Sequence, residues 1–444
     1  MCAQPKLFAK KGESKRWRWQ IFAITWLAYV GYYLVRKPFS VAKVELARPG
    51  VMGLSKADMS WMDGANSVAY AAGQFMWGFL GDKFGTRAIV LTGMLAAVTT
   101  SLLAGASTTV FTLGLLLVVQ GFFQSSGWAP LAKNMGEFFS RPERGRVMGW
   151  WSTNYAFGGF LASSLAGLAI RWGGGWRHAF WLPALTLFLI WVLFLLFQRN
   201  RPEDVGLPPI EEERLGETQP LHGAEGSAEL LVEGSWNVVA AVLRNRMIWL
   251  LAGVYFLIKP TRYLILYWSP VYINERLGTG AAESGILGSM FDLAGPIGTL
   301  VGGYLSDRVF QSRRMPIAII ALISLAVLMM TFRYLPLTRL AIGAGLFVVG
   351  FLLFIPDSLL AGTAAIDFGT RKGASTASGV INGCGSIGQI IGVTLPGWIQ
   401  RIVGRGHDIW DPIFFGLGVS LAVAGLALIP QWNRLPDAVN APKP

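Results

Sequence analysis

The sequence predicts an all-α membrane protein with twelve transmembrane helices, arranged as two six-helix bundles related by a pseudo-two-fold axis. Three observations carry this prediction. The chain of 444 residues is 53% hydrophobic and only 14% charged, whereas soluble domains are about 25% charged. Its apolar residues gather in runs of about 20, the length that crosses a bilayer as a helix. A long polar segment and a repeated pair of landmarks divide these runs into two similar halves.

Each half contains six apolar runs. They lie near residues 19–38, 59–81, 88–107, 110–132, 147–170 and 177–197, and then near 246–272, 284–305, 315–334, 337–363, 375–397 and 410–431. The stretch "NRPEDVGLPPIEEERLGETQPLHGAEGSAE" separates the two sets and has the charge, Pro and Gly content of a solvated linker. The predicted organisation is a tail (1–18), a first bundle (19–197), a central linker (198–245), a second bundle (246–431) and a short tail (432–444).

The basic residues predict the orientation of the chain. Most of the 38 Lys and Arg residues fall in segments that would lie on the same side as both termini. We therefore expect a multi-pass protein of the cell's inner (plasma) membrane with both termini in the cytoplasm. The basic N-terminus has no apolar core or small-residue cleavage site before Trp19, so no cleaved signal peptide is predicted.

Two landmarks recur at nearly the same separation in the chain. Asp82, in "GFLGDKFGTR", follows the second run, and Asp307, in "GGYLSDRVFQSRR", follows the eighth. Arg36 lies in the first run and Arg262 in the seventh. Unrelated landmarks that share one offset are the signature of two parallel halves built from the same parts.

Arg36 is unusual because a charge near the middle of a bilayer costs roughly 2.5–3.5 kcal/mol on insertion scales. At helical spacing it shares one face with three tyrosines, namely Tyr29, Tyr32 and Tyr33. Three phenols and a guanidinium suit the wall of a polar cavity better than a lipid contact. The neighbouring Lys37 is expected to extend toward the outer interface instead.

Arg262 repeats this arrangement in the second half, with Lys259 one turn earlier on the same side and Pro260 between them. If the halves pack around a central axis, Arg36 and Arg262 would face each other and repel unless an anion joined them. A phosphate suits this position because the planar guanidinium binds it through paired, charge-assisted hydrogen bonds. Both arginines are therefore predicted to bind a phosphate group.

Three carboxylates are candidates to neutralise these cations when the site is empty. Asp292 lies in the eighth run and Asp357 in the tenth. Each is either a counter-ion that the cargo displaces or part of a fixed ion pair, and the sequence leaves both readings open. Asp63, near the start of the second run, is expected at the membrane interface.

Several motifs carry a resemblance to a known family. Twelve spans, a long central loop and "GxLxDxxGxR" after the second span resemble the major facilitator superfamily. More narrowly, "YYLVRKPF", "FFQSSGWAP", "PERGRVMGWWS", "RYLILYWSPVY" and "YLSDRVF" are similar to the organophosphate:phosphate antiporter family over nearly the whole chain. The resemblance implies exchange of glycerol-3-phosphate, hexose phosphates or phosphoglycerate for inorganic phosphate, with Arg36 and Arg262 binding the substrate phosphate.

Three positions depart from the glycerol-phosphate carriers of that family. Gln74 stands where they have Lys, Tyr155 where they have His, and Lys259 where they have Tyr, whereas Tyr70 matches a cavity aromatic. The resemblance therefore implies a phosphate site but leaves the organic part of the cargo open. Lys259 either attracts a second anionic group of the cargo or pairs with Asp292 or Asp357.

The loop motifs and the glycine stretches have separate expected roles. Asp82, Arg144 and Asp307 are expected to form salt bridges of an inner gate, by analogy with the superfamily, and the alternative is a solvated turn. The stretches "GTLVGG" and "NGCGSIGQIIG" are expected to let helices approach closely.

The sequence therefore predicts a secondary transporter that works by alternating access about a site near the middle of the membrane. No ATP-binding motif, catalytic dyad or metal-ligand set appears, so no enzyme activity, cofactor or metal is expected. The net charge of +13 is spread over short loops, so nucleic acid is not an expected partner, and the protein is expected to act as a monomer. The alternatives are a proton-coupled anion symporter of the same fold and a sugar-phosphate sensor for a signalling kinase.

Overall fold

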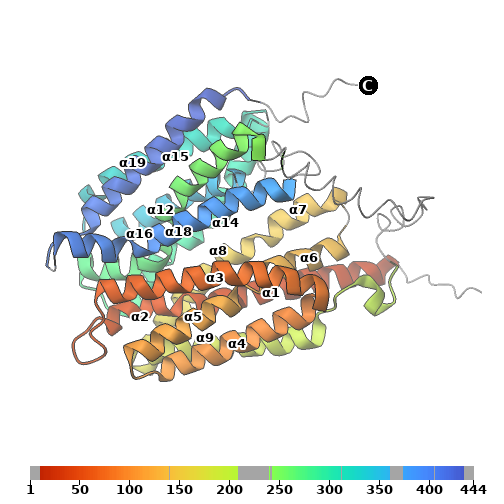
Figure 1. Cartoon of the computed structure of the whole chain (residues 1–444), viewed down its shortest axis with the longest axis horizontal. Helices are drawn as coiled ribbons and strands as arrows, with labels where there is room; N and C mark the ends of the chain where they lie inside the picture. Colours follow the sequence, from red (N-terminus) through yellow and green to blue (C-terminus); the bar gives the residue numbers. More distant parts are fainter. Residues whose placement is uncertain are drawn as a thin grey trace, which may run out of the picture. The chain divides into compact units, whose positions relative to one another are not determined.

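The computed structural model describes residues 11–139, 141–208, 240, 243–311, 313–360, 374–404 and 406–434. Within these ranges the regular structure is entirely helical (Figure 1). Each of the twelve runs predicted from the sequence coincides, as far as it is described, with a helix or with two consecutive helices. The last three residues of the run 337–363 lie outside the described residues. Most of the predicted central linker (209–239) and of the two tails lies outside the described residues.

The helices of the first half follow one another with short breaks. They are α1 (Lys11–Arg36), α2 (Pro38–Leu46), α3 (Lys56–Phe84), α4 (Thr86–Ala106), α5 (Val110–Gln124), α6 (Trp128–Phe138), α7 (Arg141–Trp151), α8 (Thr153–Gly173), α9 (Arg177–Phe197) and the 3₁₀ turn η1 (Pro202–Val205). The α1–α2 break falls where the sequence requires it, because Pro38 lacks an N–H and disfavours the helical conformation of Lys37. As the first residue of α2, Pro38 occupies the helical position that tolerates proline best.

The second half repeats this layout after the linker. Its elements are α12 (Arg246–Leu277), α13 (Ala281–Gly288), α14 (Met290–Tyr304), the π turn η2 (Leu305–Val309), α15 (Arg314–Thr331), η3 (Phe332–Tyr334), α16 (Arg339–Ser358), α18 (Ala374–Val403), α19 (Trp410–Leu428) and η5 (Ile429–Gln431).

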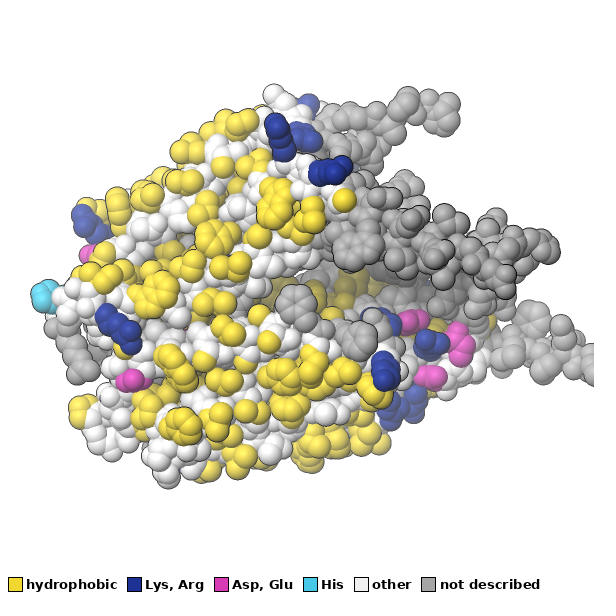
Figure 2. All heavy atoms as spheres, in the orientation of Figure 1, with side chains coloured by type: hydrophobic (Ala, Val, Ile, Leu, Met, Phe, Trp, Pro, Cys, Tyr) yellow, Lys and Arg dark blue, Asp and Glu magenta, His cyan; other side chains and the backbone are white. Residues whose placement is uncertain are grey.

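Eight helical segments in the described part of the chain are long and apolar enough to cross a membrane. They are Thr86–Ala106, Val110–Phe138, Arg177–Phe197, Arg246–Leu277, Ala281–Val309, Arg314–Tyr334, Arg339–Ser358 and Trp410–Gln431. The other predicted spans fall on α1, α3, α7 with α8, and α18, which are richer in Gly, Trp, Tyr and polar residues. On the face drawn in Figure 2, apolar side chains cover the middle of the helices and charged side chains lie toward their ends.

Packing divides the chain into two compact units, Met1–Phe39 with Ala65–His222 and Ser40–Gly64 with Gly223–Pro444. Within each unit the long helices run side by side (Figure 1). In the first unit α1 packs on α8 and α4 on α9, and in the second α12 packs on α18 and α15 on α19. The first helical span therefore pairs with the fifth, and the third with the sixth, in both units.

The second and fourth spans complete this shared scheme. In the first unit, Asn66 and Trp77 of α3 donate hydrogen bonds to the carbonyls of Leu117 (2.7 Å) and Phe122 (2.9 Å) on α5. In the second unit, α14 packs against α16. The repeat detected in the sequence therefore corresponds to the same pairing of helices in each unit.

Residues 40–64 precede most of the first bundle in sequence but pack with the second unit. Ser40 Oγ donates to the carbonyl of Tyr267 on α12 at 2.9 Å. Ser60 Oγ accepts from the backbone amide of Gly397 on α18 at 2.8 Å. We call residues 40–64 the docking segment, because α2 and the start of α3 are hydrogen-bonded to two helices of the second half.

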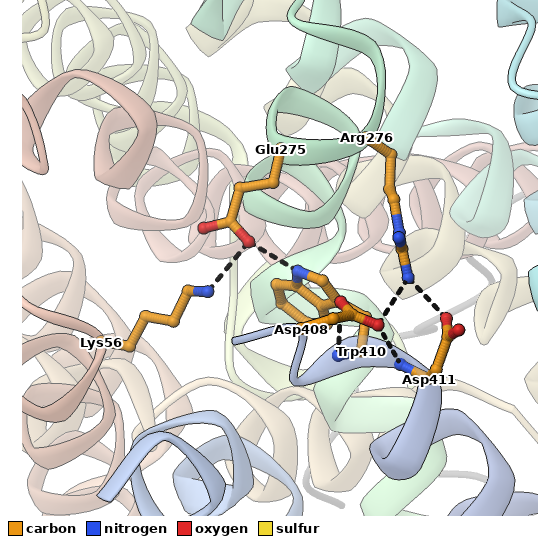
Figure 3. A network of polar contacts seen from close by, with 6 residues as sticks. All are labelled: Lys56, Glu275, Arg276, Asp408, Trp410 and Asp411. Atoms are coloured by element: carbon orange, nitrogen blue, oxygen red, sulfur yellow. Dashed lines mark hydrogen bonds and ion pairs between the residues drawn. The ribbon is translucent and has the colours of Figure 1, made fainter. Parts of the chain in front are cut away.

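A polar network at the end of α12 adds to this attachment (Figure 3). It contains Lys56, Glu275, Arg276, Asp408, Trp410 and Asp411. Lys56 of the docking segment pairs with Glu275 at 2.9 Å, and Glu275 also accepts from the Trp410 indole at 2.6 Å. Arg276 pairs with Asp408 at 3.0 Å and with Asp411. The network therefore connects the docking segment, the last turn of α12 and the first turn of α19.

Candidate functional site

Arg36 ends α1 and is partly buried among polar and aromatic groups of the first unit. Its Nε donates to Gln124 Oε1 at 3.3 Å. Its guanidinium carbon lies 4.6 Å from the ring centres of both Tyr33 and Tyr70. Ring faces attract a guanidinium electrostatically, so two of the predicted site tyrosines hold Arg36 at the end of its helix.

The break between α5 and α6 places Gln124 beside Arg36. Gln124 is the last residue of α5, and the next helix starts at Trp128. Tyr32 secures this break, since its hydroxyl hydrogen-bonds Ser126 Oγ at 2.8 Å and the Val90 carbonyl at 3.2 Å. Gly127 is needed there, because a Cβ at this position would lie 2.9 Å from the Tyr32 ring.

The other aromatic candidates of this half lie around the core. Tyr29 is buried, with its ring 5.1 Å from Trp128 and 6.0 Å from Trp151. Tyr155 is half-buried and meets Trp128 edge-on at 6.5 Å. Gln74 is exposed one turn after Tyr70 on α3. Among these predicted residues, the structure brings Tyr33 and Tyr70 directly to Arg36.

Arg262, Lys259 and Asp357 form a buried cluster in the second unit. The two cations occupy successive turns of α12, and Asp357 lies near the end of α16. Asp357 Oδ2 accepts from Arg262 Nη1, and Oδ1 lies 3.1 Å from Lys259 Nζ. The sequence left Asp292 and Asp357 equal as partners of Lys259, and the structure pairs Lys259 with Asp357.

Aromatic rings surround the same cluster. Lys259 Nζ lies 4.4 Å from the Tyr255 ring centre and 5.4 Å from that of Tyr263. The Arg262 guanidinium lies 4.8 Å from the Phe354 ring centre. Both units therefore present an arginine whose head group contacts aromatic rings and an oxygen-bearing side chain.

Close packing of α18 on α12 supports the turn that carries the two cations. Pro260 has no N–H, so the Phe256 carbonyl loses its usual helical partner. Gly388 lies against that carbonyl, and Gly392 lies against the carbonyl of Pro260. An added Cβ would be 2.3 Å and 2.4 Å from these two oxygens. The prediction that "NGCGSIGQIIG" provides a small face is confirmed.

Asp292 lies in the first turn of α14 and is buried. The buried Asp63 pairs with Lys43, a partner that the sequence analysis had not identified. Lys37 is 2% exposed, so the expectation that its side chain extends to the interface is wrong.

The gate residues are only partly described. Asp307 lies in the π turn η2 and pairs with Arg314, the first residue of α15. The side chains of Asp82 and Arg144 lie outside the described residues. Arg87, the second residue of α4, donates to the carbonyls of Leu195 (2.5 Å) and Gln198 (3.0 Å). It therefore caps the end of α9, where a cation is favoured.

Sequence reasoning missed several groups around the arginines, namely Gln124, Tyr255, Tyr263 and Phe354. Gln124 had a weak signal, since it recurs one turn after Gln120 as a polar residue within the apolar run "LLLVVQGFFQ". Tyr255 had a clear signal, since Tyr255, Lys259 and Arg262 follow the same helical spacing as Tyr29, Tyr33 and Arg36. Tyr263 and Phe354 had none, because their spacing does not distinguish them from packing residues.

Comparisons with known proteins agree with this architecture. The family model described as Major Facilitator Superfamily matches residues 21–393. The glycerol-3-phosphate transporter of Bacillus subtilis is 31% identical over 94% of this chain and 93% of its own. A probable hexose phosphate transport protein of Chlamydia pneumoniae is 29% identical, covering 95% and 93%. The membrane sensor protein UhpC of Escherichia coli is 28% identical, covering 94% and 92%.

A solved structure shows the same fold at low identity. It is a bacterial homologue of the human lysosomal transporter Spinster, in an inward-facing, unoccupied conformation. It aligns with a TM-score of 0.67 and 15% identity, over 94% of this chain and 95% of that one.

Proposed function

The chain belongs to the Major Facilitator Superfamily, and from this premise we propose that it exchanges an organophosphate for inorganic phosphate by alternating access. The single observation that carries the proposal is the matched position of Arg36 and Arg262. Each lies on the first long helix of its half, and each guanidinium contacts aromatic rings and an oxygen-bearing side chain. Fork-shaped guanidiniums in such surroundings are suited to bind a phosphate oxyanion.

The chemical class of the cargo follows from this site and from the relatives. A glycerol-3-phosphate transporter and a probable hexose phosphate transport protein align over nearly their full lengths. The cargo is a small phosphate ester, and inorganic phosphate is the counter-substrate because the arginines bind the group that both molecules share.

Asp82, Arg144 and Asp307 gate the inner side. The protein works as a monomer in the inner membrane, and both of its termini lie in the cytoplasm. Residues 1–18, 198–245 and 432–444 lie outside the two helical bundles.

The test is counterflow in proteoliposomes. Vesicles that contain the purified protein and internal phosphate are given labelled external phosphate, and glycerol-3-phosphate, hexose phosphates and phosphoglycerates are then added as competitors. Accumulation of label that one class of ester suppresses supports the proposal. Absence of counterflow from protein that is folded and inserted would contradict it.

A second candidate is a transporter-like sensor, and a specific observation favours it. The membrane sensor protein UhpC of Escherichia coli aligns over 94% of this chain. A sensor would bind the phosphate ester with the same arginines but exchange it slowly. Ligand binding to purified protein without counterflow would identify this role.

A further inference from the structure

The cluster on α12 and α16 holds two cations and one carboxylate, and phosphate binding by Arg262 alone does not explain the second cation. Asp357 lies between two cations, with Arg262 on one carboxylate oxygen and Lys259 3.1 Å from the other. The three residues are 8%, 7% and 4% exposed for Arg262, Lys259 and Asp357. Burial makes their charges interact strongly, since little water screens them. One carboxylate is thus shared by two buried cations.

Lys259 is held at this carboxylate by packing as well as by charge. Tyr255 and Tyr263, one turn before and after it, place their rings 4.4 and 5.4 Å from its ammonium. Gly385 of α18 lies against its stem, where a Cβ would come within 3.1 Å of Lys259 Cγ. The ammonium group of Lys259 is already surrounded by a carboxylate and two aromatic rings, so it has interaction partners within the protein when no cargo is bound.

The sum of charges shows what the lysine contributes. Arg262 and Asp357 alone would form a neutral pair, and an arriving phosphate would meet a carboxylate that repels it and competes for the guanidinium. With Lys259 present, the three groups sum to one positive charge. When phosphate occupies Arg262, Asp357 can keep a partner on the Lys259 side, so no buried carboxylate is left uncompensated.

We propose that Lys259 is a positioning residue that retains Asp357 while phosphate occupies Arg262, and that it does not itself bind the cargo. This inference rests on the proposed function. It also assigns a substrate class, because a lysine engaged by Asp357 offers no free charge to a second anionic group. The preferred cargo is a hydroxylated phosphate ester rather than a carboxylated one.

The test measures the affinity of purified protein for inorganic phosphate, together with exchange in proteoliposomes. Lys259→Met should lower phosphate affinity by at least about tenfold, because Asp357 then neutralises Arg262. Asp357→Asn should bind phosphate more tightly and exchange it more slowly, since no carboxylate displaces the anion. The double variant Lys259→Met/Asp357→Asn should recover most of the lost affinity, because it restores one net positive charge beside the cargo.

Selectivity separates this role from direct contact with the cargo. In Lys259→Met, the affinities for glycerol-3-phosphate and for a phosphoglycerate should fall by the same factor. A selective loss of the phosphoglycerate, or a double variant as weak as Lys259→Met, would overturn the proposal. If Lys259→Met does not fold, Asp357→Asn and the double variant still decide it, because a cargo-binding lysine predicts weak binding by the double variant.

A matched control comes from the same unit. Lys43→Met/Asp63→Asn removes another buried Lys–Asp pair and should leave phosphate affinity within about twofold of the wild type. An equal loss of affinity in this control would show a general effect of removing buried ion pairs and would also overturn the proposal. If wild-type protein binds no phosphate, the proposed function fails, and that outcome is distinct from every result with the variants.

Discussion

Lys43 on α2 and Asp63 on α3 form an ion pair in which the two residues are 0% and 4% exposed. The ammonium also donates to the Tyr267 carbonyl at 3.1 Å and lies 3.9 Å from the ring centre of Trp268. Both of these residues belong to α12. A single lysine therefore joins both helical parts of the docking segment to the first helix of the second half.

Breaking this pair should destabilise the protein. Lys43→Met leaves Asp63 buried without its cation, and removal of one partner of a buried pair costs about 3–5 kcal/mol. We expect a clear fall in the apparent melting temperature in detergent. Lys43→Met/Asp63→Leu should recover most of the lost stability, because apolar replacement of both partners removes the uncompensated charge.

Lys56→Met is the control within the docking segment, since its partner Glu275 is well exposed. This substitution should lower the free energy of unfolding by at most about 1 kcal/mol. Equal shifts for Lys43→Met and Lys56→Met would refute this account.

Arg36 and Arg262 should each be required as arginines. Arg36→Lys and Arg262→Lys keep the charge but lose the planar fork, so we expect phosphate counterflow to fall by at least about tenfold in each. Arg339→Lys is the matched control, because its side chain is 73% exposed and pairs with Glu283 on the surface. Wild-type counterflow in either variant would argue against phosphate binding by that arginine.

Exchange should not need a proton gradient. The proposed site binds an anion through guanidiniums that stay charged at all physiological pH values, and antiport of two phosphate compounds can run on their own gradients. Phosphate counterflow in sealed proteoliposomes should therefore persist when an uncoupler is added. Loss of counterflow, with vesicles that remain sealed to labelled sucrose, would favour the proton-coupled symporter instead.

The close approach of α18 to α12 should be sensitive to single methyl groups. Gly388→Ala and Gly392→Ala place a Cβ 2.3 and 2.4 Å from backbone oxygens of α12, so overpacking should cost about 1–3 kcal/mol each. The comparison is Gly383→Ala on the same helix, where a Cβ meets nothing within 4 Å. There the higher helix propensity of Ala, worth roughly 1 kcal/mol, should leave the melting temperature unchanged or raised. A similar loss in all three variants would refute the packing argument.

Much of the fold could be read from the sequence because a membrane imposes local rules. A spanning helix satisfies its backbone hydrogen bonds within its own segment, so a run of about 20 mostly apolar residues is enough to predict it. Eight of the helical segments in the described part of the chain meet this criterion. Within the described residues, all twelve predicted runs coincide with helices of the structure. The offset shared by Arg36 with Arg262 and by Asp82 with Asp307 likewise revealed two halves, which pair their helices in the same order.

The sequence by itself determined which residue types stand on which helix and which of them share a face, since helical periodicity is a local property. Only the tertiary structure decided which helix that face meets. Asp357, 95 residues from Arg262 in the chain, pairs with Arg262 and Lys259 of α12. The sequence alone did not distinguish Asp357 from Asp292 as the partner of Lys259. Gln124 reaches Arg36, and Lys43 reaches Asp63, through contacts between separate helices. These partners depend on how helices distant in sequence pack against each other, and the spacing of residues along one helix carries no information about its neighbour.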